Sequence, residues 1–413
     1  MTSKNSKTQN SFINRCIPDW NNLPKDAFLN NNPNSFKNWL TNFLSTFDDD
    51  LIIPLNDSIS ITINSLCAIT KISVDSNLKN DLVIINGKIE NNCRFERVFN
   101  EVRNIVDRRK RNANGELLNE NKYFKIESKT NFPIAAGLAS SAAGFAALSF
   151  GLGSLFKFKE LKEIVRIARI GSGSACRSIL DGFVHWKAGN SDENDSECIC
   201  EQITTISHWK ELRVFVITTS EERKKIGSTE AMQRSVLTSK LLKERIEECV
   251  PKRIENLKEA ILNKNFPQFA EITMAESNQL HAICLDTYPP IIYLNSTSFL
   301  LMEFVHDFNT FYSSPLIAYT FDAGPNCFLF FEEKTFPLFY NSFKKCFNYS
   351  KDLINFDENE NKEIKKLIIN EENNGEILKE KTKEIQFPWL EAKQINIQQL
   401  LLSKLGDGPK ILE

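Results

Sequence analysis

One long uncharged segment constrains the fold of this chain more than any other sequence feature. No charged residue lies between Lys129 and Lys157, and many of the residues between them are apolar. A membrane span is one use of such a segment, but this one contains Pro133, several glycines and serines, and more Ala than Leu, Ile and Val together. We therefore predict a loop of small residues that leads into a closely packed helix, and no membrane partner.

The loop in this segment, PIAAGLASSAAG at 133–144, follows a predicted strand at 123–128 and leads into a predicted helix at about 140–156. Gly137 permits close backbone approach, and the hydroxyls of Ser140 and Ser141, with free N–H groups at the helix start, can bind phosphate oxygens or a metal. The alternative is close helix packing through Ala and Gly with a serine cap. The segment is neither a Walker A loop nor a GxGxxG motif, so composition leaves both alternatives open.

A second small-residue loop, GSGSACRS at 171–178, carries Ser174 and Arg177. Two anion sites in one domain suit a doubly charged substrate, and a guanidinium can hold a carboxylate or phosphate through two parallel hydrogen bonds. The alternative is a capped helix whose arginine pairs with a surface acid.

An aspartate stands at the end of a predicted strand in the second half of the chain. Asp322 begins the sequence DAGPN between the apolar segments 316–321 and 327–331. A carboxylate in that place can orient or deprotonate a hydroxyl. The alternative is a turn in which the carboxylate accepts hydrogen bonds from nearby backbone N–H groups.

Charge and metal-ligand spacing exclude several other functions. The 51 Lys and Arg and 53 Asp and Glu give a formal net charge of -2, so no nucleic-acid partner is expected. The ten cysteines include no CxxC pair and no Cys/His metal spacing, and we interpret them as reduced thiols. Four histidines form no recognisable triad and are interpreted as structural: His185, His208, His281 and His306. No apolar leader is recognised, and a cytoplasmic enzyme is expected.

Composition changes divide the chain. The Asn-rich residues 1–50 are expected to be a divergent arm that need not be ordered, with one amphipathic helix over 36–44. Two domains are predicted to follow, at 51–207 and 208–413, and the second carries a charged, solvated insertion near 355–385.

Strand patterns begin directly after the arm. Ile59, Ile61 and Ile63 alternate with polar residues as in a half-buried strand. Residues 82–85 are apolar and precede the Asn-Gly pair at 86–87, which predicts a strand that enters a hairpin turn.

Three segments together resemble the GHMP family of small-molecule kinases and, within it, the diphosphomevalonate decarboxylases. They are NFPIAAGLASSAAGFAAL at 131–148, GSGSACRSI at 171–179 and YTFDAGPN at 319–326. The resemblance covers about residues 51–332 and implies a two-domain α+β fold, with a GHMP-type ATP-binding N-terminal domain and a C-terminal α/β sandwich, in a homodimer. It also implies that ATP and Mg²⁺ are used to convert mevalonate 5-diphosphate into isopentenyl diphosphate, ADP, phosphate and carbon dioxide, in isoprenoid and sterol biosynthesis.

The resemblance implies a role for each motif residue. Asp322 orients or deprotonates the 3-hydroxyl of the substrate, Arg177 holds the substrate carboxylate, and Ser174 contacts the substrate's anionic groups. The hydroxyl of Ser140 or Ser141 is expected near Mg²⁺. The residues implied to line the ATP phosphate loop are Gly137, Leu138, Ala139, Ser140 and Ser141.

The chain departs from the family pattern in two places. A PxNIAVIKYWGK-like segment, which supplies a lysine and aromatic residues to the site, is missing, so residues 1–50 are expected to provide neither its strand nor its lysine. The alternative is that residues 36–44 dock there and Lys37 substitutes. Asp181 replaces a glycine and is expected to compete for Arg177. The alternative functions are a related mevalonate or phosphomevalonate kinase or decarboxylase, and an inactive homologue.

Overall fold

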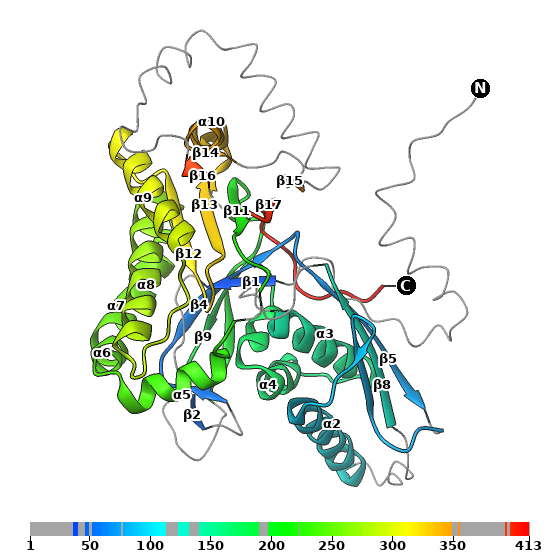
Figure 1. The fold of residues 1–413 in the computed structure, drawn as a ribbon. Helices are drawn as coiled ribbons and strands as arrows, with labels where there is room; N and C mark the ends of the chain where they lie inside the picture. Colours follow the sequence, from blue (N-terminus) through cyan, green and yellow to red (C-terminus); the bar gives the residue numbers. More distant parts are fainter. Residues whose placement is uncertain are drawn as a thin grey trace, which may run out of the picture.

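The computed structural model describes most of the chain. The described residues are 36–39, 46–48, 52–75, 77–112, 123–131, 140–189, 197–222, 224–348, 354–355, 393–394 and 397–412. Within them, helices and mixed sheets form an N-terminal and a C-terminal part (Figure 1). Most of the predicted N-terminal arm and of the insertion at 355–385 lies outside the described residues.

The first sheet of the N-terminal part has the strand order β1-β4-β9-β10, and all its neighbours are antiparallel. Its strands are β1 (Phe36–Trp39), β4 (Ser58–Ile63), β9 (Phe183–Trp186) and β10 (Cys200–Thr204). The predicted strand at 59–63 is confirmed, but its expected half-burial is wrong, because both faces of β4 are buried. Ile59 packs in one hydrophobic cluster with the C-terminal part, and Trp186 packs in a second cluster with the N-terminal helices.

The beginning of the described chain is a strand rather than a helix. Strand β1 pairs with β4 from Phe36 opposite Ile63 to Trp39 opposite Ser60, so the helix expected over 36–44 is wrong at 36–39. The expectation that residues 1–50 supply no strand here is also wrong. The open edge of β4 offers unpaired N–H and C=O groups, and pairing with them outweighs a short helical pattern.

The second N-terminal sheet has the order β5-β8-β6-β7, in which β6 and β8 are parallel. Its strands are β5 (Ala68–Asp75), β8 (Tyr123–Thr130), β6 (Leu82–Ile85) and β7 (Lys88–Ile89). The predicted hairpin turn is confirmed: Asn86 and Gly87 have φ of 49° and 80°, a left-handed conformation that suits these two residue types. Helices α2 (Cys93–Asn112), α3 (Ser140–Leu155) and α4 (Leu161–Gly171) lie beside this sheet (Figure 1).

Helix α3 forms from the uncharged segment. Its small residues permit the close packing that the sequence predicts: Ala142, Ala143, Ala146 and Ala147 are all buried. No helix in the described part of the chain combines the length and the apolar character that crossing a bilayer requires.

The C-terminal part is built on the sheet β12-β13-β11-β17-β15, with β11 at its centre. Its strands are β12 (Ile317–Phe321), β13 (Cys327–Glu332), β11 (Leu212–Thr218), β17 (Gln399–Lys404) and β15 (Ile354–Asn355). All seven residues of β11 are buried, since strands pair on both of its edges and hydrophobic side chains cover both faces. Short strand pairs complete the fold: β2 (Thr46–Asp48) with β3 (Ile53–Pro54), and β14 (Phe347–Asn348) with β16 (Lys393–Gln394).

Helices α8 and α9 pack against strand β12 of this sheet, and α7 packs against α8 (Figure 1). The helices are α5 (Ser228–Thr238), α6 (Leu241–Glu244), α7 (Val250–Leu262), α8 (Phe266–Asp286), α9 (Ser296–Phe311) and α10 (Phe336–Cys346). The short helical segments η2 (Gly173–Ile179), η4 (Arg245–Cys249) and η5 (Glu333–Thr335) join longer elements. Strand β12 lies against α8 and α9, which leaves Asp322 at its buried end.

Candidate active site

The two predicted small-residue loops meet through their serines. Ser141, in the first turn of α3, has its hydroxyl oxygen 3.4 Å from that of Ser172, and Ser172 lies 3.2 Å from the hydroxyl of Ser174. Ser140 is the first residue of α3. The other predicted loop residues, Gly137, Leu138 and Ala139, lie outside the described residues, as does the side chain of Ser140.

Arg177 is fully buried in the short helix η2, so the alternative of a surface ion pair is wrong. Its Nη1 donates a 2.6 Å hydrogen bond to the Ser58 hydroxyl at the start of β4, and its guanidinium lies 5.3 Å from the ring centroid of Trp186 on β9. A stacked, hydrogen-bonded guanidinium has little rotational freedom. It is therefore fixed in place before any ligand binds.

The electrostatics of Arg177 show what surrounds it. Burial lowers its pKa to about 10, while two nearby thiols and Asp322 act in the opposite direction. A pKa of this size leaves the guanidinium charged at neutral pH. Asp181, expected to compete for it, instead accepts a hydrogen bond from the side chain of Gln202 on β10.

Asp322 is a partly buried carboxyl group that few hydrogen bonds stabilise. Burial raises its pKa, whereas Lys224, the backbone N–H of Ala323 and Arg177 act to lower it. The contact with Ala323 is the kind of turn contact that the sequence allowed. Since Arg177 and Lys224 both act on this carboxyl, the structure brings together Asp322 and Arg177 from the two parts of the chain.

Lys224 is a site residue that sequence reasoning missed. Its Nζ donates to the Ser228 hydroxyl at 2.6 Å and lies 3.4 Å from the carbonyl of Ala323. Burial lowers its pKa, while Asp322 raises it. The only sequence signal was a lysine in the charged stretch EERKK at 221–225, which is usually a solvated loop.

A further cation lies next to this lysine. Arg94 in the first turn of α2 donates a 2.7 Å hydrogen bond to the Thr229 hydroxyl, and its charge helps to lower the pKa of Lys224. Two cations, Arg177 and Lys224, thus act on one partly buried aspartate, and a third, Arg94, acts on Lys224. Such a set can bind a multiply charged anion and stabilise charge that develops during a reaction.

The peptide that carries Asp322 is itself held by α8. Its N-terminal neighbour Phe321 donates its backbone N–H to the Ser277 hydroxyl at 2.9 Å, and His281 forms a hydrogen bond to the Phe321 backbone. Burial lowers the pKa of His281 to about 4, so this imidazole is neutral at pH 7.

The histidines form no catalytic triad in the described chain. His185 contacts Asp57, His208 contacts the carbonyl of Ile261, and His306 contacts the Tyr319 hydroxyl. The described residues also contain no group of three or more His, Cys, Asp or Glu side chains that could hold a metal ion. A Mg²⁺ ion here would take its ligands from phosphates, water and a hydroxyl.

The fold and this site place the chain in the GHMP-kinase-like class of proteins, and comparisons identify its family. A model of the diphosphomevalonate decarboxylase-like N-terminal domain matches residues 42–200, and a model of the mevalonate 5-diphosphate decarboxylase C-terminal domain matches residues 214–412. The chain belongs to the diphosphomevalonate decarboxylase family, a family of carboxy-lyases.

Individual relatives agree with this assignment. The diphosphomevalonate decarboxylase of Danio rerio is 45% identical over 297 residues, which are 71% of this chain and 73% of the relative. That of Saccharomyces cerevisiae is 42% identical over 310 residues, which are 72% of this chain and 77% of the relative.

Solved structures share the fold. Mevalonate diphosphate decarboxylase from Trypanosoma brucei matches with a TM-score of 0.78 at 31% identity, over 92% of this chain and 96% of that one. A structure described as MDDEF in complex with MVAPP, AMPPCP and magnesium matches with a TM-score of 0.70 at 26% identity, over 92% of this chain and 97% of that one. The expected two-domain α+β fold is confirmed.

Proposed function

We infer that this site carries out the reaction of its family, the ATP-dependent decarboxylation of mevalonate 5-diphosphate to isopentenyl diphosphate, a step of isoprenoid biosynthesis. The observation that carries the inference is Asp322, a partly buried carboxyl whose pKa Arg177 and Lys224 both act to lower. A base for the substrate hydroxyl and cations for its anionic groups are the two requirements of this chemistry.

Asp322 is assigned to the substrate's 3-hydroxyl. A tertiary hydroxyl is a poor leaving group, and bound ATP supplies the phosphoryl group that converts it into a better one. Asp322 accepts a hydrogen bond from the hydroxyl and takes its proton as the oxygen attacks phosphorus. The raised pKa of Asp322 favours this role, because proton transfer is most efficient to a base whose pKa lies nearer the working pH.

Arg177 and Ser174 are assigned to the substrate's charged groups. Arg177 holds the carboxylate that leaves as carbon dioxide and keeps it beside the carbon from which phosphate departs. As the carbon–carbon bond breaks, its electron pair forms the new double bond. Ser174 contacts the anionic groups, and Lys224 balances the charge of the phosphate that departs.

The start of α3 is assigned to ATP. Gly137, Leu138, Ala139, Ser140 and Ser141 form the phosphate loop of this proposal. The fit rests on Ser141, whose hydroxyl lies within the serine group that also contains Ser174, and on a 16-residue helix whose first turn follows the loop. The hydroxyl of Ser140 or Ser141 would complete the ligands of a phosphate-bound Mg²⁺.

This assignment also gives each of the two domains a role. Residues 51–207 would form the ATP-binding domain and residues 208–413 the C-terminal domain, with the boundary between the ends of the two family matches at 200 and 214. We also propose that the enzyme is a cytoplasmic homodimer, as in the family that it resembles. Light scattering on the purified chain and cell fractionation test these two points.

Product analysis tests the function directly. Purified protein with ATP and Mg²⁺ is given mevalonate, mevalonate 5-phosphate or mevalonate 5-diphosphate, and ADP and carbon dioxide are measured separately. We expect equal amounts of both products with mevalonate 5-diphosphate alone. ADP without carbon dioxide would identify a kinase, and neither product would identify an inactive homologue.

A further inference from the structure

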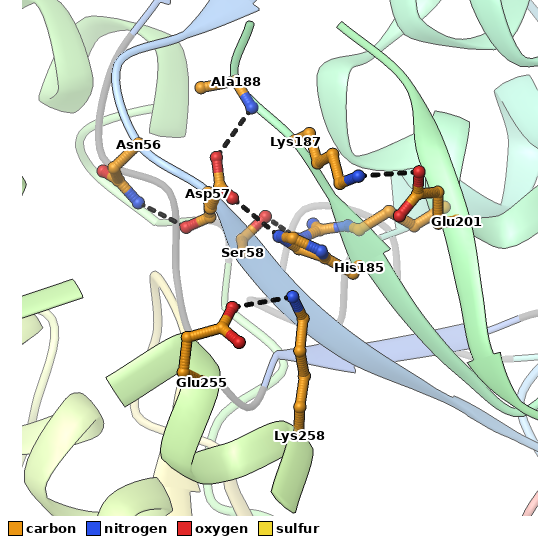
Figure 2. Close-up of polar contacts among 10 residues, drawn as sticks. Asn56, Asp57, Ser58, His185, Lys187, Ala188, Glu201, Glu255 and Lys258 are labelled. Atoms are coloured by element: carbon orange, nitrogen blue, oxygen red, sulfur yellow. Dashed lines mark hydrogen bonds and ion pairs between the residues drawn. The ribbon is translucent and has the colours of Figure 1, made fainter. Parts of the chain in front are cut away.

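A carboxylate outside the reacting groups is held unusually firmly at the start of β4. Figure 2 shows Asp57 between His185 and Ala188. One carboxylate oxygen lies 2.7 Å from Nε2 of His185, and the other accepts a 2.8 Å hydrogen bond from the backbone N–H of Ala188. The Asp57 carbonyl accepts a further 2.7 Å hydrogen bond from the side chain of Asn56.

The protonation of this pair follows from its chemistry. A carboxylate only accepts hydrogen bonds, so Nε2 of His185 carries the proton and donates it. Burial of Asp57 would raise its pKa, but the hydrogen bonds from His185 and Ala188, together with the charges of His185 and Lys258, hold the pKa below its ordinary value. The pair is therefore a charge-assisted contact.

The Asp57–His185 pair is connected to Arg177 through the neighbouring residue Ser58. Ser58 follows Asp57 in the chain, is fully buried, and accepts the 2.6 Å hydrogen bond from Arg177. In the β4–β9 pairing, Ser58 stands opposite Trp186, over whose ring the guanidinium lies. His185 directly precedes Trp186 on β9. The contacts Asp57–His185 and Ser58–Trp186 therefore lie at the same end of one strand pair.

A hydrolytic triad is excluded by the contacts themselves. In such a triad the histidine takes a proton from the serine and the aspartate orients it. Here Nε2 of His185 is used by Asp57, and the Ser58 hydroxyl accepts from Arg177. His185 therefore does not serve as a base for the Ser58 hydroxyl, and the arrangement is suited to fixing a strand end.

We propose that Asp57 and His185 are positioning residues for Arg177, acting through the Ser58 hydroxyl. The pair fixes the start of β4 to β9, and so fixes the oxygen to which the guanidinium donates. The inference rests on the proposed role of Arg177 as the group that holds the substrate carboxylate. Small displacements of such a group are costly, because about 1 Å of misplacement can reduce a rate by about a hundredfold.

Steady-state kinetics of three variants test the proposal. His185→Leu removes the donor and retains much of the side-chain volume. We expect kcat to fall about tenfold and the KM for mevalonate 5-diphosphate to rise about threefold, with the KM for ATP changed by less than about twofold. His185→Gln retains an N–H donor, and its kcat should stay within about threefold of the parent protein.

Lys187→Met is the matched control. Lys187 lies on the chain directly after β9 and forms a 2.7 Å ion pair with Glu201 that is also drawn in Figure 2. The two side chains are 40% and 47% exposed, and no described hydrogen bond joins either of them to Ser58 or Arg177. Its kinetic constants should equal those of the parent protein.

A double variant separates positioning from general destabilisation. If His185 acts through Ser58, the loss in His185→Leu/Ser58→Ala should be no greater than the larger single loss. Multiplicative losses, or a parallel rise in both KM values with a lower melting temperature, would overturn the proposal. If His185→Leu does not fold, Asp57→Asn replaces it, and an unchanged KM for mevalonate 5-diphosphate in that variant would overturn it equally.

One comparison distinguishes this inference from the proposed function. Full activity of Arg177→Lys would show that Arg177 does not hold the substrate carboxylate. The proposed function of Arg177 and the positioning role that rests on it would then both fail. Impaired Arg177→Lys together with normal His185→Leu would leave the function intact and refute only the positioning role.

Discussion

Two aspartates are linked to Arg177, and their environments shift the two carboxyl pKa values in opposite directions. Asp57 accepts hydrogen bonds from His185 and Ala188, its side chain is 35% exposed, and its pKa is lowered. Asp322 is also partly buried, but its pKa is raised, although Lys224 and Arg177 act to lower it. Nearby positive charge is thus common to both, and the two direct hydrogen bonds to the Asp57 carboxylate distinguish them.

The difference indicates which carboxylate is suited to react. Direct hydrogen bonds stabilise the charged form of Asp57, which makes it a weak base and a firm structural contact. The Ala323 N–H, Lys224 and Arg177 offset only part of the desolvation cost of Asp322, so its charged form is less stable and more basic. Replacing each aspartate by asparagine should therefore affect stability with opposite signs.

Asp322→Asn should give the largest effect. The amide retains the shape but cannot take the hydroxyl proton, so we expect kcat to fall by at least about a hundredfold. The same variant should be more stable than the parent at neutral pH, because a carboxylate whose pKa is raised by the folded state is removed. Carbon dioxide release and thermal unfolding measure the two effects.

The stability gain should also depend on pH in a defined direction. Folding favours the protonated form of Asp322, so the cost to the parent protein begins above 3.8 and is complete only above the raised pKa. The advantage of Asp322→Asn should shrink as the pH falls through that value toward 3.8, the ordinary aspartate pKa. Normal turnover in Asp322→Asn, or a loss of stability at pH 7, would contradict the comparison.

Arg177→Lys should give the next largest effect. The lysine retains the positive charge but loses the planar group that both lies over Trp186 and donates to Ser58. We expect kcat/KM for mevalonate 5-diphosphate to fall by about thirtyfold, with the KM for ATP nearly unchanged. A parallel effect on both substrates would indicate a general loss of structure instead.

Much of this site followed from local sequence because its residues lie in loops with unusual composition. Small residues before α3 and in η2 allowed anion binding, and the position of Asp322 at the end of an apolar strand made it a candidate to orient or deprotonate a hydroxyl. The same reasoning identified the strands at 59–63 and 82–85 from their periodicity and turn residues.

The remaining features depend on contacts between distant segments. Strand β1 forms where β4 offers an open edge, which no pattern within residues 36–39 reveals. Lys224 becomes a site residue only because its loop lies beside Ala323, 99 positions later in the chain. His185 was interpreted as one structural histidine among four, and its link to Asp57 spans 128 positions.

Lys224→Met tests how a nearby positive charge sets the pKa of Asp322. Lys224 lowers the pKa of Asp322, so its removal should raise that pKa further. If Asp322 must be ionised to act as a base, the acidic limb of the kcat/KM profile should move to higher pH, and the value at neutral pH should fall about tenfold. Lys225→Met is the matched control on the neighbouring residue, and an equal shift in that variant would assign the effect to net charge.

Asp57→Asn should give the smallest effect, of the opposite sign to Asp322→Asn. Because the folded state lowers the pKa of Asp57, its ionised carboxylate contributes stability above 3.8, the ordinary value, and that contribution disappears as the pH falls through the lowered one. The side chain is about one third exposed, so solvent screening should limit the loss at pH 7 to less than about 1 kcal/mol. Urea unfolding at pH 7 and near pH 3 measures the difference.

Glu255→Gln provides the control, since Glu255 is mostly exposed and pairs with Lys258 within one helix. Equal losses at both pH values would show that the asparagine disturbs packing, and that the carboxylate charge of Asp57 does not hold the strand end.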